Sequence, residues 1–326
     1  DELKYRREVE QYLMEKAGQK GDKLKTVGVA AMKNDKKKQK EYRNKIAVVY
    51  AEGEIVESLP GGFDAAESTI TERINDDLKK LERDDDVKAV VNSPGGSAYV
   101  SEQIWKAVSD LKKKKPVIVS MGSVAASGGY YISAGATKIV AEPNTITGSI
   151  GIFGIFPNAT GLYKKVALTT DVVKTNRYAD MLDPARPMTD EEKLLMQSFV
   201  NRGYDLFLTR CADGRGKSKA DIDSIAQGRV WTGEQALKIG LVDELGGLER
   251  AIELAGEQAK IINYNIVEVS AKSDFLRDLL EKQLEHVKAS IVREALGDDY
   301  EYVKVLRSAR PTYGVQALMP YTMKPL

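Results

Sequence analysis

Short apolar runs alternate with amphipathic segments along most of this chain. The runs have the length and composition of buried strands, and the predicted strands are Ile46–Tyr50, Val87–Val91, Pro116–Ser120, Lys138–Ala141 and Thr169–Lys174. Two segments between them carry apolar residues at helical spacing, Thr69–Leu81 and Ser101–Lys112. Strands that alternate with helices predict an α/β fold with a mainly parallel sheet and flanking helices.

The second half of the chain is predominantly helical in pattern. Thr189 and Glu192 have the spacing of a capping box and predict a helix that runs to about Cys211. A second amphipathic helix is predicted for Asp274–Leu296, and the tail from Arg310 is rich in Pro and Tyr and is predicted to be extended. Residues 1 to about 20 are charged and helical in pattern.

These patterns divide the chain into three parts. Residues 1–44 are predicted to be a helical and basic junction, residues 45–265 a compact domain, and residues 266–326 a C-terminal helix with an extended tail. The basic run Lys33–Lys45 is interpreted as a solvated linker, with a membrane-surface contact as the alternative.

Composition excludes several classes of protein. The 326 residues carry 49 basic and 48 acidic side chains, and a net charge of +1 gives no reason to expect nucleic acid as a partner. A single cysteine, Cys211, and a single histidine, His286, exclude an internal disulfide and a metal site built on several His or Cys ligands, and no cofactor is expected. The most apolar stretch, Ile146–Phe156, is interrupted by glycines and is too short to span a bilayer. The start at Asp1 fits a processed or truncated product.

Two glycine-rich loops carry the candidate chemistry. Asn92–Ser97 and Ser123–Tyr131 each follow a predicted strand, with one helix and one strand between them. In an α/β sheet such loops meet at one edge, where one can supply a nucleophile and the other backbone N–H groups for an oxyanion. Either loop alone also fits an ordinary turn or a tight helix contact, so the specific signal is their conjunction.

The chain resembles the signal peptide peptidase A family, also called protease IV, over about residues 46–260. These are serine proteases of crotonase-like fold, distantly similar to the proteolytic subunit of Clp protease. The stretches that carry the resemblance are Asn92–Ser97, Ala125–Tyr130, Thr147–Gly151, Gly228–Gly233 and Gly240–Asp243. The match is to the C-terminal half of the long form, in which two related halves form one chain.

The resemblance implies a role for particular residues. Ser127 would be the nucleophile, Gly96 and Gly128 the backbone donors of the oxyanion hole, and Ser149 the residue that orients a lysine base. It further implies that a substrate pocket is formed by Gly95, Ile150, Gly151 and Ile152.

The family's lysine base is missing from this chain. Single-domain members carry it directly before a segment that here reads Asp180–Pro184, and the preceding residue is Ala179. The alignment therefore predicts that position 179 faces Ser127 and that the lysine comes from an N-terminal half or a neighbouring protomer. A local substitute from Lys164, Lys165 or Lys174 is the alternative. Neither His286 nor Cys211 has a partner motif that marks it as catalytic.

The prediction for function is therefore one half of a serine/lysine peptidase that degrades cleaved signal peptides. The resemblance implies apolar signal peptides as substrates, a homo-oligomer, and a location at the bacterial inner membrane with the catalytic domain on the periplasmic side. A non-catalytic half that binds peptides or assembles the enzyme is one alternative, and a crotonase-type acyl-CoA enzyme is another. The apolar tail after Tyr313 is a candidate for an added strand in a substrate groove, with packing on the body as the alternative.

Overall fold

The structure is a computed structural model that describes residues 6–19, 24–26, 42–57, 69–71, 74–81, 87–269 and 314–318. The chain forms two compact units, Asp1–Tyr42 and Arg43–Leu326. Helix α1 (Arg6–Lys16) belongs to the first unit and confirms the helical pattern at the start of the chain. The predicted helix Asp274–Leu296, His286 and most of the basic run lie outside the described residues. The predicted three-part division stays a prediction.

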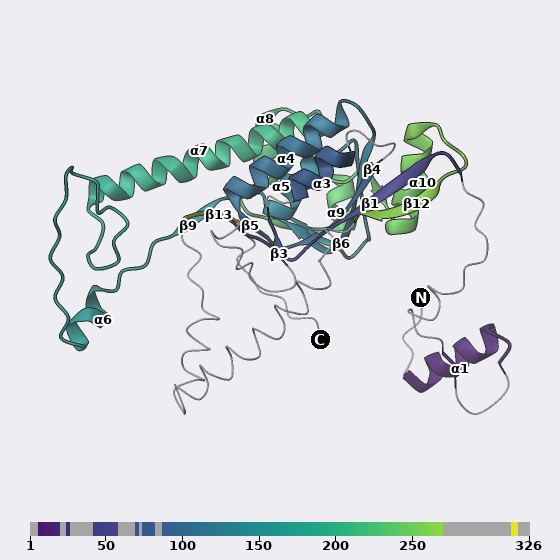
Figure 1. Cartoon of the computed structure of the whole chain (residues 1–326), viewed down its shortest axis with the longest axis horizontal. Coiled ribbons are helices and arrows are strands. Elements are labelled where there is room, and N and C mark those ends of the chain that lie inside the picture. Colours follow the sequence, from purple (N-terminus) through teal and green to yellow (C-terminus); the bar gives the residue numbers. More distant parts are fainter. Residues whose placement is uncertain are drawn as a thin grey trace. The chain divides into compact units, whose positions relative to one another are not determined.

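The larger sheet of the second unit is almost entirely parallel (Figure 1). Its strands run in the order β10-β8-β6-β4-β1-β12, β7 pairs with β6, and β11 pairs with β7. Only β10 and β8 pair in antiparallel fashion. The bounds are β1 Lys45–Glu52, β4 Val87–Ser93, β6 Val117–Ala126, β7 Lys138–Ala141, β8 Ile146–Gly148, β10 Val230–Thr232, β11 Glu244–Leu245 and β12 Asn265–Val269. The predicted α/β class is confirmed.

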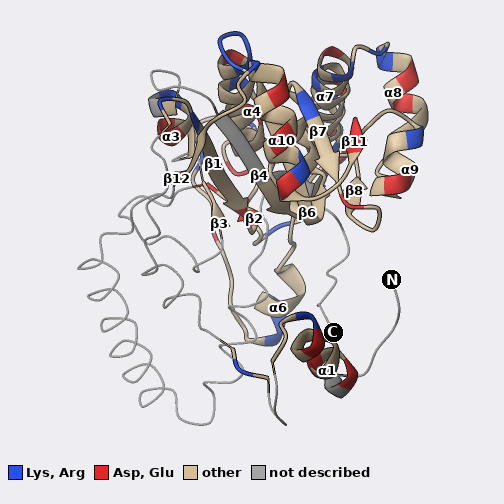
Figure 2. Cartoon of the chain, turned by 90° about the vertical axis from the view of Figure 1, so that its right-hand side faces the viewer, with Lys and Arg blue, Asp and Glu red and all other residues tan. Residues whose placement is uncertain are grey.

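Helices cover both faces of this sheet. Val117 and Val119 of β6 belong to the large core cluster, whereas Ile118 between them packs with Ala251 and Leu254 of α10. The alternation follows from the period of two in a strand. Figure 2 shows α10 in front of the sheet and α4 beside it, with basic and acidic residues mixed on the outer helices. The helices are α3 Ile74–Leu81, α4 Ala98–Lys112, α5 Gly128–Ala134, α6 Thr160–Lys165, α7 Asp190–Arg215, α8 Lys219–Ile225, α9 Gly233–Lys238 and α10 Leu248–Ala259.

A second sheet crosses the region of the two glycine-rich loops. Its order is β3 (Thr69–Ile70), β2 (Glu54–Ile55), β5 (Gly95–Ser97), β13 (Gly314–Leu318) and β9 (Phe153–Ile155). The extended tail is confirmed in part, because β13 lies between β5 and β9. Two predictions need correction here. The loop at Gly95–Ser97 forms a strand because it has partners on both sides, and the helix predicted from Thr69 begins only at Ile74.

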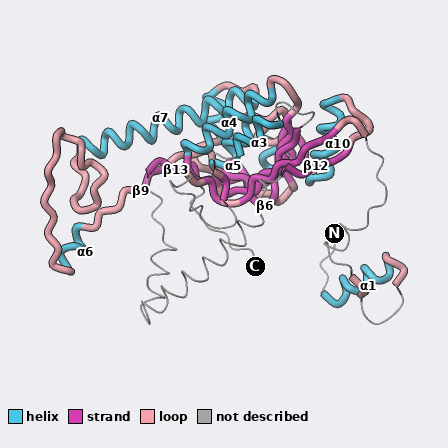
Figure 3. The backbone as a smooth tube through the Cα atoms, viewed as in Figure 1, coloured by secondary structure: helices cyan, strands magenta, loops and turns pink. Residues whose placement is uncertain are grey.

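Helix α7 begins at the predicted capping box and is longer than expected. The Thr189 side chain accepts a hydrogen bond from the Glu192 N–H, and the Glu192 carboxylate accepts one from the Thr189 N–H. Residues 156–189, which we call the arm, precede α7 and are loop apart from α6 (Figure 3). The strand predicted at Thr169–Lys174 is wrong. These residues are all exposed and pair with none of the strands that the structure describes, and an isolated strand is not stable in water.

An ion-pair cluster holds the arm to the start of α7. The Arg186 guanidinium donates to Asp180 at 2.8 Å and to Glu192 at 2.6 Å, and both carboxylates are buried. The Arg186 hydrogen bonds lower the pKa of the Asp180 carboxyl, and the Lys174 ammonium adds to this effect. The hydrogen bonds from Arg186 and from the Thr189 N–H lower the pKa of Glu192 to about 2.

We expect this cluster to make stability depend on acid pH. A carboxyl whose pKa is lowered by folding contributes its full stabilisation above its unfolded pKa of about 4, and loses it as the pH falls through the folded value. The thermal midpoint should therefore fall between about pH 5 and pH 2 by a smaller amount in Arg186→Met than in the parent chain. Arg177→Met is the control on the exposed surface of the arm, and its thermal midpoint should depend on pH as that of the parent chain does. The same pH dependence of the thermal midpoint in Arg186→Met and in the parent chain would contradict the assignment.

The contact between α7 and α5 predicts a second effect on stability. A Cβ on Gly214 of α7 would lie 1.8 Å from the carbonyl oxygen of Ala134, the last residue of α5. Gly214→Ala should force the helices apart and destabilise the fold by about 1–3 kcal/mol. Gly161 in α6 has no atom within 4 Å of the same position, so Gly161→Ala should be neutral or stabilise by up to about 1 kcal/mol. The urea unfolding midpoints of the two variants and of the parent chain measure these effects. A midpoint of Gly214→Ala similar to that of the parent would show that the contact between α7 and α5 is not tight.

Candidate active site

Ser127 sits in a strained conformation where β6 ends and α5 begins. Its φ is +52° and its ψ is −113°, a region that costs a non-glycine residue about 1–3 kcal/mol. Two backbone hydrogen bonds hold it there, from the Ser127 N–H to the Gly148 carbonyl and from the Tyr131 N–H to the Ser127 carbonyl, both at 2.8 Å. The Ser127 Oγ is buried and has no hydrogen-bond partner within the described part of the chain. Strain and an unpaired buried hydroxyl together are typical of a reactive side chain.

The first turn of α5 packs backbone to backbone against the end of β4. A Cβ on Gly129 would lie 2.5 Å from the carbonyl oxygen of Ser93, so only glycine fits at this position. Ser93 itself pairs with Ala125 of β6, after a register shift between Val91 and Ser93. These contacts bring Ser127 beside the loop that starts at Asn92.

That loop is built for a close approach of the backbone. Gly95 has a φ of +102° and Gly96 a φ of +154°, and a Cβ on Gly96 would lie 1.9 Å from the Ile55 carbonyl oxygen. The buried Ser93 hydroxyl donates to the Gly53 carbonyl at 2.6 Å and accepts from the Gly95 N–H at 3.2 Å. Ser93 therefore ties Gly95 to the end of β1 and holds the start of the glycine loop in place, a role that the sequence alone did not indicate although the motif contains it.

The predicted oxyanion donors come from the two loops that meet here. Gly128 is the first residue of α5, and the first N–H groups of a helix have no acceptor within it. Gly96 lies in β5, which α5 contacts. The shared location is compatible with the predicted roles of Gly96 and Gly128, which stay predictions.

Ser149 lies close to Ser127 because β8 pairs with the end of β6. Ala126 pairs with Gly148, and Ser149 follows with a φ of +47°. The Ser149 N–H donates to the Arg229 carbonyl at 2.8 Å, and a Cβ on Gly148 would lie 2.7 Å from Cδ1 of Trp231. The stretch Gly228–Gly233 therefore holds Ser149 in place. Sequence reasoning quoted this stretch without giving it a function.

The residues predicted to line the substrate pocket fall in different environments. Ile150 is fully buried in the large core, and a Cβ on Gly151 would lie 3.1 Å from the Cα of Gly228. Ile152 packs against the same core and is partly exposed. Gly95 lies in β5, directly opposite Leu318 of β13. Contact of these four residues with a substrate stays a prediction.

Two tyrosines anchor α5. The Tyr130 hydroxyl donates to the Leu241 carbonyl at 2.9 Å, and the Tyr131 hydroxyl donates to the Glu102 carboxylate at 2.7 Å. Glu102 also accepts hydrogen bonds from Arg210 of α7. Burial, followed by the hydrogen bond to Glu102, raises the pKa of the Tyr131 phenol, so it remains a donor at all ordinary pH values. Helix α5, which follows Ser127, is thereby fixed to both α4 and α7.

The cysteine and the candidate local bases have ordinary environments. Cys211 is fully buried, and burial raises the pKa of its thiol, in agreement with the prediction that it is inert. Lys164 and Lys165 are exposed at the end of α6. The Lys174 ammonium lies 3.0 Å from the Asp180 carboxylate.

The expectation that position 179 faces Ser127 within one chain is wrong. The neighbouring Tyr178 donates a hydrogen bond to Glu191 in the first turn of α7, whereas the ring of Tyr131, near Ser127, contacts Phe207 of the same helix. A helix rises 1.5 Å per residue, so Glu191 and Phe207 are about 24 Å apart. Figure 1 shows the arm beyond the end of α7 that points away from α5.

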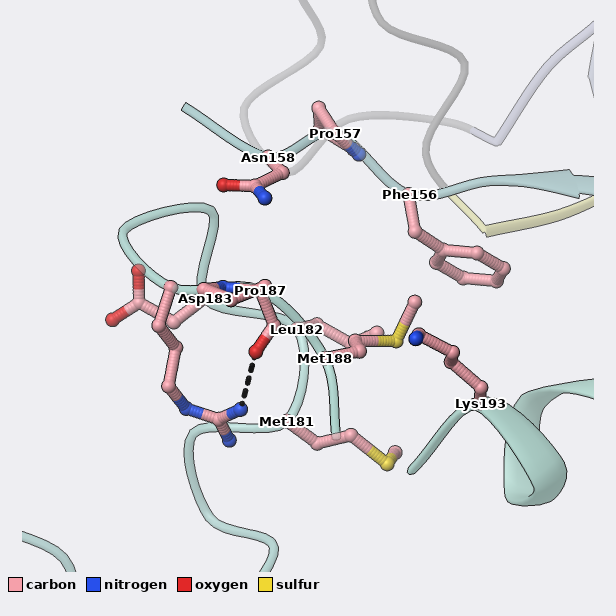
Figure 4. Close-up of a pocket in the computed structure, with 10 residues that line it drawn as sticks. Phe156, Pro157, Asn158, Met181, Leu182, Asp183, Pro187, Met188 and Lys193 are labelled. Carbon is pink, nitrogen blue, oxygen red and sulfur yellow. Dashed lines mark hydrogen bonds between the residues drawn. The ribbon is translucent and has the colours of Figure 1, made fainter. Parts of the chain in front are cut away.

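A cavity at the base of the arm is remote from Ser127. It has a volume of about 340 Å³ (Figure 4). Its lining residues are Phe156, Pro157, Asn158, Met181, Leu182, Asp183, Arg186, Pro187, Met188 and Lys193. None of them belongs to β5, β6 or α5, so this cavity does not hold the reacting atoms.

The described residues contain neither a metal-binding cluster nor a membrane-spanning helix. Within those ranges, no three His, Cys, Asp or Glu side chains are grouped so that they could hold a metal ion. Among the helices that the structure describes, none combines the length and apolar character that crossing a bilayer requires.

Comparison with known proteins gives two family matches. Residues 109–262 match the model of peptidase family S49, and residues 63–147 match the model of Clp protease. Together these ranges cover both glycine-rich loops and the strands that carry them. The Clp protease match agrees with the predicted crotonase/Clp-protease-like fold.

Curated relatives carry peptidase names. Protease 4 of Haemophilus influenzae is 46% identical over 219 residues, which is 65% of this chain and 34% of that protein. The chloroplastic serine protease SPPA of Arabidopsis thaliana is 35% identical over 289 residues, 85% of this chain and 41% of that protein. Protease 4 of Salmonella typhi is 40% identical over 227 residues, 68% of this chain and 36% of that protein. The chain therefore spans between a third and a half of the length of these three relatives.

Solved structures match this chain at lower sequence identity than the curated relatives do. A ClpP1 variant from Listeria monocytogenes has a TM-score of 0.40 and 17% identity, with 63% of this chain and 94% of that chain covered. A variant of the membrane-bound stomatin-specific protease 1510-N has a TM-score of 0.45 and 14% identity. The match covers 71% of this chain and 100% of that chain. The family match, together with relatives at 35–46% identity, leads to one assignment: the chain belongs to peptidase family S49, the serine peptidases that include signal peptide peptidase A and protease 4.

Proposed function

We propose that this chain is the nucleophile-bearing half of a serine/lysine endopeptidase that degrades cleaved signal peptides. The observation that carries the proposal is the geometry of Ser127. A strained serine with an unpaired buried hydroxyl lies beside a glycine loop whose conformation is fixed by hydrogen bonds. This arrangement suits acyl transfer, in which a nucleophile and preorganised backbone donors act on one carbonyl group.

The reaction follows from these positions. The Ser127 Oγ attacks the peptide carbonyl carbon while its proton passes to a lysine amine. The negative oxygen of the tetrahedral intermediate accepts hydrogen bonds from the N–H groups of Gly96 and Gly128. Collapse breaks the C–N bond, the lysine ammonium gives its proton to the leaving amine, and water then hydrolyses the acyl-serine by the same steps. Ser149 would hold the lysine, whose pKa must be lowered by burial for it to act as a base.

The lysine is supplied by another half of the parent protein or by a neighbouring protomer. Ala179 occupies the place of the family's lysine, and the arm carries that position away from Ser127. The arm and the start of α7 also expose large apolar side chains, including Leu162 at 60%, Val173 at 100% and Leu194 at 72%. Exposed apolar surface of this kind marks contact with another protein, which supports a homo-oligomer or a paired half.

Substrate class and location belong to the same proposal. The chain's own β13 pairs with β5 and β9, so an extended apolar segment can be held next to the glycine loop by backbone hydrogen bonds. Cleaved signal peptides are apolar and accept this mode of binding. We propose, as the family resemblance implies, that the enzyme acts at the bacterial inner membrane with its catalytic domain on the periplasmic side.

Ser127→Ala should abolish peptidase activity of the assembled enzyme and leave the fold intact. Loss of a nucleophile costs several orders of magnitude in rate, whereas removal of one hydroxyl changes stability by about 1 kcal/mol or less. The assay measures cleavage of an apolar peptide by this chain alone and after mixing with the lysine-bearing half. Ser123→Ala, an exposed serine of the same strand, is the control and should keep activity. Turnover by Ser127→Ala would refute the mechanism, and full turnover by the chain alone as a monomer would refute the external base.

Ser93→Ala should lower kcat by about tenfold or more and leave KM nearly unchanged. The lost hydroxyl holds Gly95 in place, and misplaced oxyanion donors affect the transition state more than the bound peptide. Ser133→Ala is the matched control, since that buried hydroxyl bonds only to the Gly129 carbonyl of its own helix, at 2.7 Å. A rise in KM with kcat unchanged would show instead that Ser93 serves binding.

A further inference from the structure

We infer that the cavity at the base of the arm is a substrate subsite for one apolar or aromatic side chain. The peptide that fills it would lie along β9 in the place of β13, and the side chain in question would stand four residues before the one opposite Gly96. This inference rests on the proposed function, because it assumes that the groove between β5 and β9 accepts a peptide.

The register of β13 defines the direction of a peptide in that groove. Ala317 lies opposite Gly96 of β5, and Gln316 lies opposite both Ser97 of β5 and Phe153 of β9. Gly314 lies opposite Ile155, the last residue of β9. In a peptide of the same register, the residues toward the C-terminus therefore lie near the glycine loop. Its N-terminal end runs toward the arm.

One further residue brings the peptide to the cavity. A bound peptide that continues the same register by one residue, about 3.4 Å along the strand, would place that residue opposite Phe156. Directly opposite residues on antiparallel strands project their side chains to the same face of the sheet. Phe156 lines the cavity, and Figure 4 shows its ring there beside Met188. The side chain of the peptide residue at this position would accordingly lie on the cavity side.

The apolar part of the lining suits an uncharged side chain, and the lining carboxylate of Asp183 accepts a hydrogen bond from the Ala185 N–H at 2.8 Å. Met181, Leu182 and Met188 give apolar surface, and methionine adapts to side chains of different shape. The two cationic lining residues already have partners, since Arg186 pairs with Asp180 and Glu192, and Lys193 lies 2.9 Å from Asp190. The cavity, of about 340 Å³, is large enough for an aromatic ring.

Binding of short peptides to the full chain tests the inference. The protein carries Ser127→Ala to prevent turnover and Ala317→Pro to weaken β13, because proline removes a hydrogen-bond donor from the strand. The probes are two fluorescent, N-acetylated hexapeptides, one with the sequence of residues 313–318 and one with alanine in place of its first residue, tyrosine. We expect the tyrosine peptide to bind about 10- to 100-fold more tightly, the range for burial of one large side chain.

A matched pair of arm variants locates the side chain. Leu182 lines the cavity and Leu168 does not, yet their exposures are similar, 59% and 58%. Leu182→Asp should weaken binding of the tyrosine peptide by about tenfold or more and leave the alanine peptide unchanged, because a charge at an apolar subsite costs affinity only when that subsite is used. Leu168→Asp should change neither affinity.

The outcomes separate this inference from the proposed function. Equal binding of the two peptides, or an equal effect of Leu182→Asp on both, would overturn the subsite and leave the strand mode of binding intact. If neither peptide binds to the protein that carries Ala317→Pro, both the proposed peptide binding between β5 and β9 and the subsite are refuted. The expected pattern combined with no turnover by the unmodified Ser127 enzyme, after addition of the lysine-bearing half, would refute the peptidase and retain the subsite.

Discussion

The candidate site depends on one backbone contact, between the first turn of α5 and the end of β4. At Gly129 a side chain would collide with the Ser93 carbonyl, so glycine lets the two segments approach to a distance that no other residue permits. This approach sets Ser127 beside Gly95 and Gly96. The position of α5 is further stabilised by Tyr131, whose hydroxyl donates a hydrogen bond to Glu102 of α4. The candidate nucleophile and the proposed oxyanion donors are thus positioned by rigid elements, which is what preorganised catalysis requires.

The glycine-containing motifs act as one interlocked unit although they are spread over the chain. The Arg229 carbonyl holds Ser149, and the Trp231 indole packs on Gly148. Asp243 accepts hydrogen bonds from the Ile139 N–H of β7 and from Arg215 at the end of α7. Motifs that in sequence look like independent turns therefore support one another. A substitution in any of them would alter the position of Ser127.

The arm has a different character from this rigid centre. Its residues are largely exposed, and it is tied to α7 by buried carboxylates around Arg186 instead of by a large apolar core. The second sheet connects the two regions, because β9 leads from the neighbourhood of Ser149 into the arm and β13 lies along it. A peptide in that sheet would contact both the catalytic loop and the arm.

The sequence alone determined the α/β class, the strands β1, β4, β6 and β7 and the capped start of α7, because strand runs and the Thr189 capping box are local signals, whereas the candidate nucleophile Ser127 followed from the family resemblance. It failed where pairing partners or distance decide the result. Gly95–Ser97 is a strand because β2 and β13 flank it, and Thr169–Lys174 is not one because none of the described strands pairs with it. Position 179 matches a catalytic lysine in alignment, yet the length of α7 carries it away from Ser127. Long-range contacts, which no local pattern encodes, decided these points.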